Sequence, residues 1–504
     1  MSIKILKEVF TKELEELIFN IDLNDPNIYK ELSNPNKIGI FQINGGTAEK
    51  LCNEVKPENF DEIIAVNALS RPGPMEAATP FYVERKNGTP SPYPQVVNDL
   101  IKDTHNTFIY QEQIMEIFHK IGGFSLEDAN EVRNLMKKLG KLEKDPDDVK
   151  KWERTVKKFV AGATKNGINE DMAKKIANDL SSFSGYSFNK AHATSYAYIA
   201  AVTAYFSYYF RPYFYSSTLT YEVDREKYLL DRLYSVKNQG IEILPPDINK
   251  SGTHFFPLND KQIIFGLSDV KYVSETAAET ILANRPYKDL FDFIIKTRSR
   301  NVTSRVVVAL ISIGAFDFIS KERKKLIHLF ESFWAKKGGT KIEEKLKDLY
   351  DNLKNGIDYL PGLETTETDY VAYEKEYIGF RFFSSPFTNK KIEAFREMRK
   401  KFLIYFTLAE VGRVSKKVPV CINSVRPFKD KNGNTMAFMD VEDLKGNNIS
   451  IPVFQTYYKY LTSELQENYL YLMNIYMGND GKLIFGRDEW MENPDEIKRL
   501  VKKI

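Results

Sequence analysis

The stretch Gly185–Phe206, GYSFNKAHATSYAYIAAVTAYF, sets polar residues in front of a long run of alanine, tyrosine and phenylalanine. The 20 residues Ala191–Phe210 contain no Asp, Glu, Lys or Arg, and a helix of this length could reach across a membrane. Their apolar side chains are mostly Ala, Tyr and Phe, however, and four Ser or Thr residues interrupt them. We therefore predict a buried helix at the centre of a large helical domain rather than a membrane span.

The first turn of this predicted helix carries Asn189, Lys190 and His192. A helix N-terminus attracts anions, because its unpaired N–H groups and the helix dipole present partial positive charge. The pattern therefore suits a phosphate group. From the residues alone, a core helix whose first turn happens to be polar is the preferred interpretation.

Length and composition indicate a multidomain globular protein. At ~150 residues per domain, 504 residues suggest roughly three domains, and 42% hydrophobic with 28% charged residues excludes disordered and fibrous classes. The net charge of +3 gives no global signal for nucleic-acid binding, although residues 131–190 hold 14 basic against 9 acidic side chains. Two distant cysteines, Cys52 and Cys421, without a zinc-binding spacing favour a reducing, cytosolic setting, and the charged N-terminal segment does not resemble a secretory signal.

Residues 1 to about 217 have the pattern of helices joined by Gly- and Pro-bearing connections. Ser125, followed three residues later by Asp128, approximates a capping box and predicts a helix after it. Arg133, Lys137 and Lys138 should project from that helix. Taken alone, such a basic trio is more often a solvated surface than a binding site.

The pattern changes to short extended runs near residue 243 and returns to helical pairs between residues 266 and 319. From about Lys401 the period becomes that of strands, with a turn at KDKNGNT, residues 429–435. Roughly five strands over ~90 residues suit a small barrel. The 34 phenylalanines and 29 tyrosines of the chain either fill cores or form stacking platforms, and composition does not distinguish the two.

Taken together, a series of segments resembles the bacterial C-family replicative DNA polymerases, that is, the alpha subunits of DNA polymerase III. The segments, in family order, are IGIFQINGG, ALSRPGPMEAATPFYVERKNG, THNTFIYQEQIMEIFHKIGGFSLEDANEVRNLMKK, FSGYSFNKAHATSYAYIA, ILPPDINKSG, IIFGLSDVKYVSETAAETI, LISIGAFD and EKEYIGF, followed by the terminal barrel. Such a series over nearly the whole chain is more specific than any one motif.

The resemblance implies a multidomain α+β protein. It would consist of mainly α-helical polymerase fingers, a helical helix-hairpin-helix and linker region, and a C-terminal small β-barrel of the OB fold, which binds oligonucleotides. The expected domains are fingers with the nucleotide pocket at 1–218, outer fingers with the helix-hairpin-helix-like segment at 219–320, a helical linker or clamp-binding-like region at 321–398, the OB fold at 399–490 and a tail at 491–504.

The resemblance also implies residues that bind the incoming nucleotide. Arg133 resembles the fingers arginine, whose guanidinium can grip phosphate oxygens in a fork, and Lys137 and Lys138 match the lysines that follow it. Asn134 stands where the family often has a second arginine.

The other expected nucleotide-binding residues lie in GYSFNKAHA. Tyr186 resembles the tyrosine that packs against the incoming base and sugar. Asn189, Lys190 and His192 head the helix that closes this pocket, so the resemblance reverses the preference for a merely structural first turn.

Four residues are expected to contact DNA: Arg71, Lys271, Phe438 and Tyr457. Arg71 belongs to RPGP, where a buried structural salt bridge is an equal alternative; YQEQ, residues 110–113, is similarly ambiguous between packing and substrate contact. Lys271 precedes a hairpin in which Tyr272-Val273-Ser274 replace the usual glycines, so backbone contact with phosphate is doubtful there. For the barrel aromatics, packing is favoured over stacking on bases.

The family's metal-binding aspartates lie in a palm domain that precedes these segments. Neither MDVED, residues 439–443, nor KDPDD, residues 144–148, offers a convincing substitute. We therefore expect Mg²⁺ to be held mainly by a palm on another chain, as in a split polymerase of bacteriophage type or from another divided gene.

The expected partners are primer-template DNA, dNTP, the palm-containing chain and a sliding clamp, in the bacterial cytoplasm and without a membrane. QENYLYL, from Gln466, comes near to a clamp-binding peptide but has the pattern of a strand. The alternative function is a non-catalytic DNA-binding or scaffold protein derived from a polymerase. A self-sufficient nuclease or repair enzyme would need a metal site that the sequence does not display.

Overall fold

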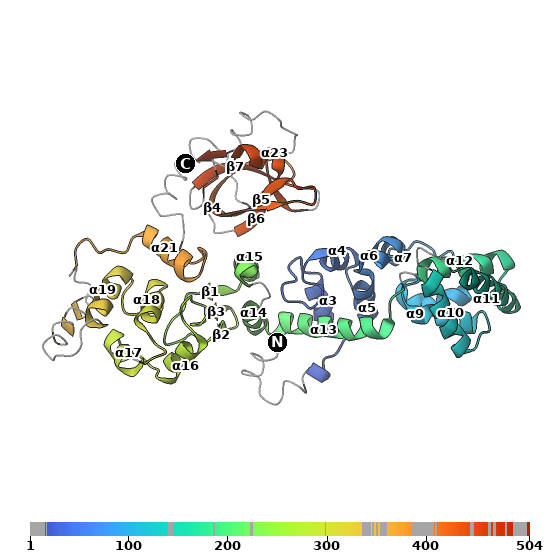
Figure 1. Ribbon diagram of the computed structural model, residues 1–504, viewed down its shortest axis with the longest axis horizontal. Helices are drawn as coiled ribbons and strands as arrows, with labels where there is room; N and C mark the ends of the chain where they lie inside the picture. Colours follow the sequence, from blue (N-terminus) through green and yellow to red (C-terminus); the bar gives the residue numbers. More distant parts are fainter. Residues whose placement is uncertain are drawn as a thin grey trace. The chain divides into compact units, whose positions relative to one another are not determined.

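The computed structural model describes residues 16, 18–139, 145–184, 187–221, 225–297, 299–334, 344, 347–348, 351–352, 360–384, 408, 411–443, 448–461, 465–466, 470–478, 481–486 and 501–503. The chain divides into two compact units, Met1–Thr218 and Leu219–Ile504, shown in Figure 1. Over the described residues the structure is mostly helical and ends in a barrel-like antiparallel sheet, which confirms the predicted α+β class.

The first unit is built from helices. Those described are α3 (Pro26–Leu32), α4 (Gly46–Val55), α5 (Phe60–Leu69), α6 (Pro72–Ala77), α7 (Thr79–Lys86), α8 (Gln95–Ile101), η1 (Lys102–Thr104), α9 (Gln111–Lys120), α10 (Leu126–Leu139), α11 (Pro146–Lys165), α12 (Glu170–Ser184), α13 (Lys190–Tyr209) and α14 (Arg211–Thr220), the last of which continues into the second unit. The predicted cap of α10 is present, since the backbone N–H of Asp128 donates to Ser125 Oγ over 3.0 Å.

The alanine-rich stretch forms α13. Its Ala193, Ala197, Ala200 and Ala204 are at most 1% exposed, and these small side chains let α13 lie closely against α3 and α5 (Figure 1). The opposite face carries exposed side chains such as Ile199, so the core helix is buried on one face rather than all round. No helix among the described residues is long and apolar enough to span a membrane.

Helices α9 to α12 pack together in the same unit, and two glycines set how closely they approach. A Cβ atom added to Gly162 of α11 would lie 2.0 Å from the carbonyl oxygen of Gly122, the residue that follows α9 after one intervening position. A Cβ on Gly122 would likewise meet the ring of Phe159 at 2.6 Å. The helices therefore meet at backbone distance, with aromatic rings around the contact.

The second unit begins with helices around a small sheet. The elements are α15 (Arg225–Lys237), β1 (Glu242–Leu244), β2 (Phe256–Asn259), β3 (Gln262–Ile264), α16 (Glu275–Ala283), α17 (Leu290–Thr297), α18 (Ser304–Ser312), α19 (Arg323–Trp334) and α21 (Glu367–Tyr377). Strand β3 lies between β1, which runs parallel to it, and β2, which runs antiparallel. The predicted extended runs and helical pairs are thus present.

The C-terminal sheet consists of β4 (Lys416–Lys429), β5 (Thr435–Asp443), β6 (Asn448–Val453), β7 (Leu470–Met477), β8 (Leu483–Phe485) and β9 (Val501–Lys503), with α23 (Gln455–Leu461) after β6. The order is β6-β5-β4-β7-β8, with β9 paired to β7, and all pairs are antiparallel. Buried Val, Ile and Met side chains from alternating strand positions form its core. The predicted turn lies between β4 and β5, and the residues following Gln466 enter a strand, β7, as expected. The first strand-like run expected after about Lys401, residues 402–414, lies partly outside the described residues, and its described residues, 408 and 411–414, are not in a strand.

Candidate functional site

The start of α13 carries three of the predicted site residues, Asn189, Lys190 and His192. Asn189 is the N-cap, and its side chain accepts a 2.8 Å hydrogen bond from the backbone N–H of His192. Glu112, in the first turn of α9, accepts from the backbone N–H of Lys190 over 3.0 Å and from the Asn189 amide over 3.1 Å. The chain's own carboxylate therefore lies where a helix N-terminus would otherwise bind an anion.

A short backbone pairing brings Glu112 to this position. Phe188 forms an isolated parallel bridge with Tyr110, in which its N–H donates to Ile109 and its carbonyl accepts from Gln111. This bridge places YQEQ beside the residues that lead into α13. Of the two interpretations of YQEQ, packing against this segment is thus present, and substrate contact stays a prediction.

Arg71 lies beside Phe188 and belongs to the group of side chains at the start of α13 that we call the α13 cluster: Arg71, Asp103, Glu112, Phe188, Lys190 and His192. Arg71 is the exposed N-cap of α6, and its guanidinium lies 4.6 Å from the centre of the Phe188 ring. His192 is also exposed, and the centre of its ring lies 5.6 Å from that of the same Phe188 and 4.5 Å from that of Tyr196. Two nitrogen-bearing side chains thus share one aromatic support, which holds them in place without neutralising them. Arg71 is exposed, and among the described residues it forms no buried salt bridge, which was its alternative role.

Lys190 turns back towards the protein. Its Nζ atom lies 3.9 Å from Asp103 Oδ2 and 5.6 Å from the Tyr110 ring centre. Burial raises the pKa of Tyr110 well above its usual value, so this phenol stays neutral beside the lysine. The cluster combines two basic groups, Arg71 and Lys190, with the carboxylates of Glu112 and Asp103, and is therefore nearly balanced in charge.

Arg133 and Lys138 lie on α10. Arg133 donates from Nη2 to Asn134 over 3.1 Å, and its buried Nε has no hydrogen-bond partner among the described residues. Lys138 lies 3.8 Å from Asp148. No interaction between described residues joins either side chain to the start of α13. The side chain of Lys137 and the whole of Tyr186 are outside the described residues.

In the second unit, the hairpin before α16 has a left-handed backbone conformation, which glycine usually adopts, at a residue that is not glycine. Tyr272 has φ of +71°, and the guanidinium of Arg305 lies 3.6 Å from its ring centre. The backbone N–H of Lys271 donates to the carbonyl oxygen of Tyr377 over 2.7 Å, whereas the lysine itself is exposed. Ser274 caps α16 through the N–H of Ala277. The hairpin therefore offers exposed side chains, and at least one of its amides is already engaged.

The two barrel aromatics differ in exposure. Phe438 on β5 is 41% exposed and stacks on Phe428 of β4, with ring centres 5.0 Å apart and planes 13° from parallel. Tyr457 lies on α23, not on a strand, and is 6% exposed beneath Phe485 and Gly486. Phe438 could accept a base on its free face, while Tyr457 has the packing role that was favoured for it.

The carboxylates considered as metal ligands each have a structural partner. Asp440 pairs with Arg426 over 2.7 Å, Glu442 with Arg381 over 2.9 Å, and Asp443 accepts from the backbone N–H of Leu408. Of KDPDD, Asp145 caps α11 and the next two aspartates lie in its first turn. Within the described part of the chain, no three His, Cys, Asp or Glu side chains are grouped as metal ligands.

Comparison with known proteins gives the family. Residues 2–167 match the model of the bacterial DNA polymerase III alpha subunit finger domain, and residues 240–326 match a helix-hairpin-helix motif. DNA polymerase III subunit alpha of Aquifex aeolicus is 32% identical over 490 residues, which are 95% of this chain. The chain belongs to the DNA polymerase III alpha family.

Other members of the DNA polymerase III alpha family align similarly. The subunit of Halalkalibacterium halodurans is 30% identical over 511 residues and that of a Staphylococcus aureus strain is 32% identical over 454, covering 100% and 88% of this chain. The chain spans about two fifths of the length of these relatives, 40% to 43%. The matched regions, fingers, helix-hairpin-helix and barrel, correspond to the C-terminal half of such a subunit.

Three members of the α13 cluster, Asp103, Glu112 and Phe188, were not among the sequence-predicted site residues. Phe188 supports both Arg71 and His192, and Glu112 occupies the helix start. Both lie in segments that carry the resemblance to DNA polymerase III alpha, but their roles depend on the bridge between Tyr110 and Phe188, which joins positions 78 residues apart in sequence. No periodicity could have revealed that pairing.

Proposed function

We propose that this chain provides the fingers of a replicative DNA-directed DNA polymerase and binds the incoming dNTP and the primer-template. The observation that carries the proposal is the cluster of Arg71, Lys190 and His192 at the start of α13, in a chain of the DNA polymerase III alpha family. Arg71 and His192 are exposed and are held by an aromatic ring rather than by a carboxylate, which leaves His192 available to the triphosphate and Arg71 to a DNA phosphate.

Nucleotide addition is phosphoryl transfer, in which the protein positions the triphosphate and offsets its charge. In our proposal, Arg133 grips phosphate oxygens with Lys137 and Lys138 beside it, while Tyr186 packs against the base and sugar. Asn189 fixes the first turn of α13, so that Lys190 and His192 meet the phosphates. Arg71 and Lys271 would contact the DNA backbone, and Phe438 would stack on a template base.

The described carboxylates do not fit the Mg²⁺ ions that such a reaction requires, because each of those considered already serves a cap, an ion pair or a backbone amide. We therefore propose that a palm on a separate chain holds the metal. In this scheme the polymerase acts in the bacterial cytoplasm, encoded by host or phage, and a sliding clamp would be a further partner.

The position of Glu112 favours one alternative. A carboxylate already bound to the N–H of Lys190 repels an incoming phosphate, as expected of a DNA-binding scaffold that retains the polymerase fold without binding nucleotide. For the polymerase, Glu112 must release this N–H when the triphosphate arrives. The two functions therefore differ in whether dNTP competes with Glu112.

Primer extension tests the proposal. This chain is assayed on a primed template with Mg²⁺, first alone and then with a palm-containing chain from the same genome. Extension only with both chains is expected, and the Arg133→Ala variant should lose it. Extension by this chain alone would contradict the split arrangement, and DNA binding without extension in either assay would favour the scaffold.

A further inference from the structure

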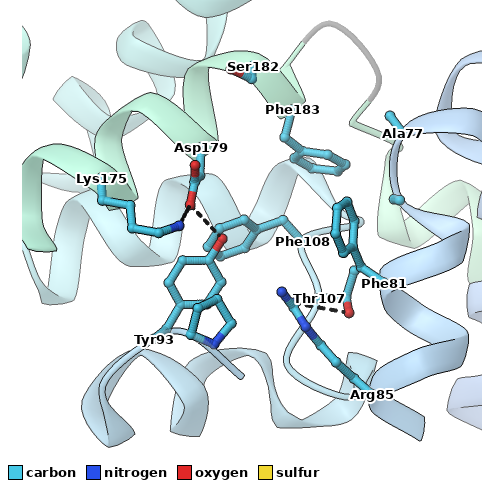
Figure 2. Close-up of a pocket in the computed structure, with 12 residues that line it drawn as sticks. Ala77, Phe81, Arg85, Tyr93, Thr107, Phe108, Lys175, Asp179, Ser182 and Phe183 are labelled. Atoms are coloured by element: carbon cyan, nitrogen blue, oxygen red, sulfur yellow. Dashed lines mark hydrogen bonds and ion pairs between the residues drawn. The ribbon is translucent and has the colours of Figure 1, made fainter. Parts of the chain in front are cut away.

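A cavity of about 410 Å³ in the first unit shares no lining residue with the α13 cluster. Four aromatic residues line it, Phe81, Tyr93, Phe108 and Phe183, and Figure 2 shows the three phenylalanines directed towards a common space. Phe108 and Phe183 are buried, whereas Phe81, on α7, is 52% exposed. The cavity is within the range of small-molecule sites, although towards its lower end.

The polar groups lie on two sides of these rings: Figure 2 shows Lys175 and Asp179 on one side and Arg85 and Thr107 on another. Arg85 donates from Nη1 to the carbonyl of Asn106 and to Thr107 Oγ1, and its guanidinium, which carries five N–H donors, also lies 5.6 Å from the Tyr93 ring centre. Asp179 accepts from Tyr93 over 2.9 Å and from Lys175 over 2.7 Å. Burial, reinforced by Asp179, raises the pKa of Tyr93, which keeps its phenol a neutral donor.

The ring positions leave room for one more planar group. The ring centres of Tyr93 and Phe108 lie 4.9 Å apart and those of Phe108 and Phe183 6.3 Å apart. Phe81 has no ring partner among the described residues, and the guanidinium of Arg85 lies 5.7 Å from its ring centre. An exposed ring beside buried rings, with fixed donors and an acceptor at the edge, suits a flat molecule that has hydrogen-bonding groups on its rim.

We propose that this cavity binds a nucleobase, stacked on Phe81 and hydrogen-bonded at its edge by Arg85. The base could belong to single-stranded DNA or to a free nucleotide, because the recognised chemistry is the same. The choice of a base among planar ligands rests on the proposed polymerase function. The cavity is a second base site, separate from the residues proposed to bind the incoming dNTP.

Fluorescence titration of the full chain tests this inference with two probes, 2-aminopurine deoxyribonucleoside and a single-stranded oligonucleotide that contains one 2-aminopurine. Stacking on an aromatic ring should quench the probe. Phe81→Ala should weaken binding roughly 5- to 100-fold, whereas Phe81→Trp, which keeps an aromatic ring, should bind as the wild type does. Phe19→Ala removes another exposed ring of the same unit and should leave binding unchanged.

The outcomes separate the two proposals. Binding of the oligonucleotide alone, lost in Phe81→Ala, identifies DNA as the source of the base, and binding of the nucleoside as well includes free nucleotides. Nucleoside binding that depends on Phe81, in a chain that binds no DNA, would support the cavity and overturn the polymerase function. Equal binding of both probes by wild type and Phe81→Ala, or no binding of either, would overturn the cavity proposal.

Discussion

The starts of α13 and α16 are both polar, and the family resemblance gives both a role next to phosphates, yet they are built differently. At α13 a carboxylate from α9 occupies the backbone, and the basic side chains rest on an aromatic ring. At α16 the helix is capped by its own Ser274, and the N–H of Lys271 is bonded to a carbonyl of α21. The backbone N–H at the start of α13 becomes available when one side chain, Glu112, moves away. The N–H of Lys271 before α16 is held by a backbone carbonyl and becomes available only if the fold changes.

This difference teaches which groups are available to a ligand. A carboxylate is exchangeable for a phosphate because both accept from the same donors. A backbone carbonyl that holds a hairpin is not exchangeable without rearranging two elements. We therefore expect nucleotide binding to depend on backbone and side chains at α13, but DNA binding at the hairpin to depend on side chains alone.

The largest expected effect is that of His192→Ala. Removing an exposed group that meets the triphosphate should lower kcat/KM for dNTP about 100-fold in the reconstituted primer-extension assay. His328→Ala, which removes an exposed histidine of α19, is the matched control and should retain the wild-type rate. If the two variants extend primers equally well, the α13 cluster does not bind the nucleotide.

Glu112→Gln should strengthen dNTP binding about fivefold, because the amide keeps an acceptor for Lys190 but loses the charge that opposes a phosphate. The dissociation constant from titration calorimetry provides the measurement. Glu116→Gln, on the same helix and paired with Lys120, is the control and should leave affinity unchanged. Weaker binding by Glu112→Gln would mean that the carboxylate organises the site instead of competing for it.

Lys271→Ala should weaken binding to duplex DNA about threefold and reduce the slope of log affinity against log salt by about one, as expected for one lost phosphate contact. Anisotropy titrations at several salt concentrations measure both quantities. Lys261→Ala, an exposed lysine between β2 and β3, should leave the slope as it is. An unchanged slope in Lys271→Ala would show that the hairpin does not touch DNA.

Tyr272→Gly should have the smallest effect, within about 1 kcal/mol of the wild-type free energy of unfolding. Glycine relieves about 1–2 kcal/mol of left-handed strain but loses the contact with Arg305 and gains entropy in the unfolded chain. Tyr272→Ala keeps the strain without the ring and should be less stable than the glycine variant. Urea unfolding measures both, and a more stable Tyr272→Ala variant would contradict this account.

Much of the fold followed from local pattern. The spacing of Ser125 and Asp128 predicts the start of α10, and KDKNGNT predicts the turn between β4 and β5. The alanine run predicts the face of α13 that packs in the core. These features depend on residues close in sequence, where spacing and capping chemistry decide the conformation.

The candidate site was less predictable because its contacts are long-range. The residue types at the start of α13 suggested an anion, but Glu112 reaches that helix only through the bridge at Phe188. Tyr457 shows the same limit: an aromatic residue in strand-like sequence lies on α23, with its ring in the core. The roles of Arg133, Lys138 and Arg71 towards ligands stay predictions.

The contact between Gly122 and Gly162 also restricts how this chain can change over time. A Cβ atom on Gly162 would meet the backbone of Gly122, and one on Gly122 would meet the Phe159 ring of α11, so a substitution at either position separates α11 from the end of α9. Repair by a second mutation is hard, since the obstacle to Gly162 is a backbone carbonyl and not a side chain that could be shortened. Among relatives that keep this helix packing, both positions should therefore remain glycine.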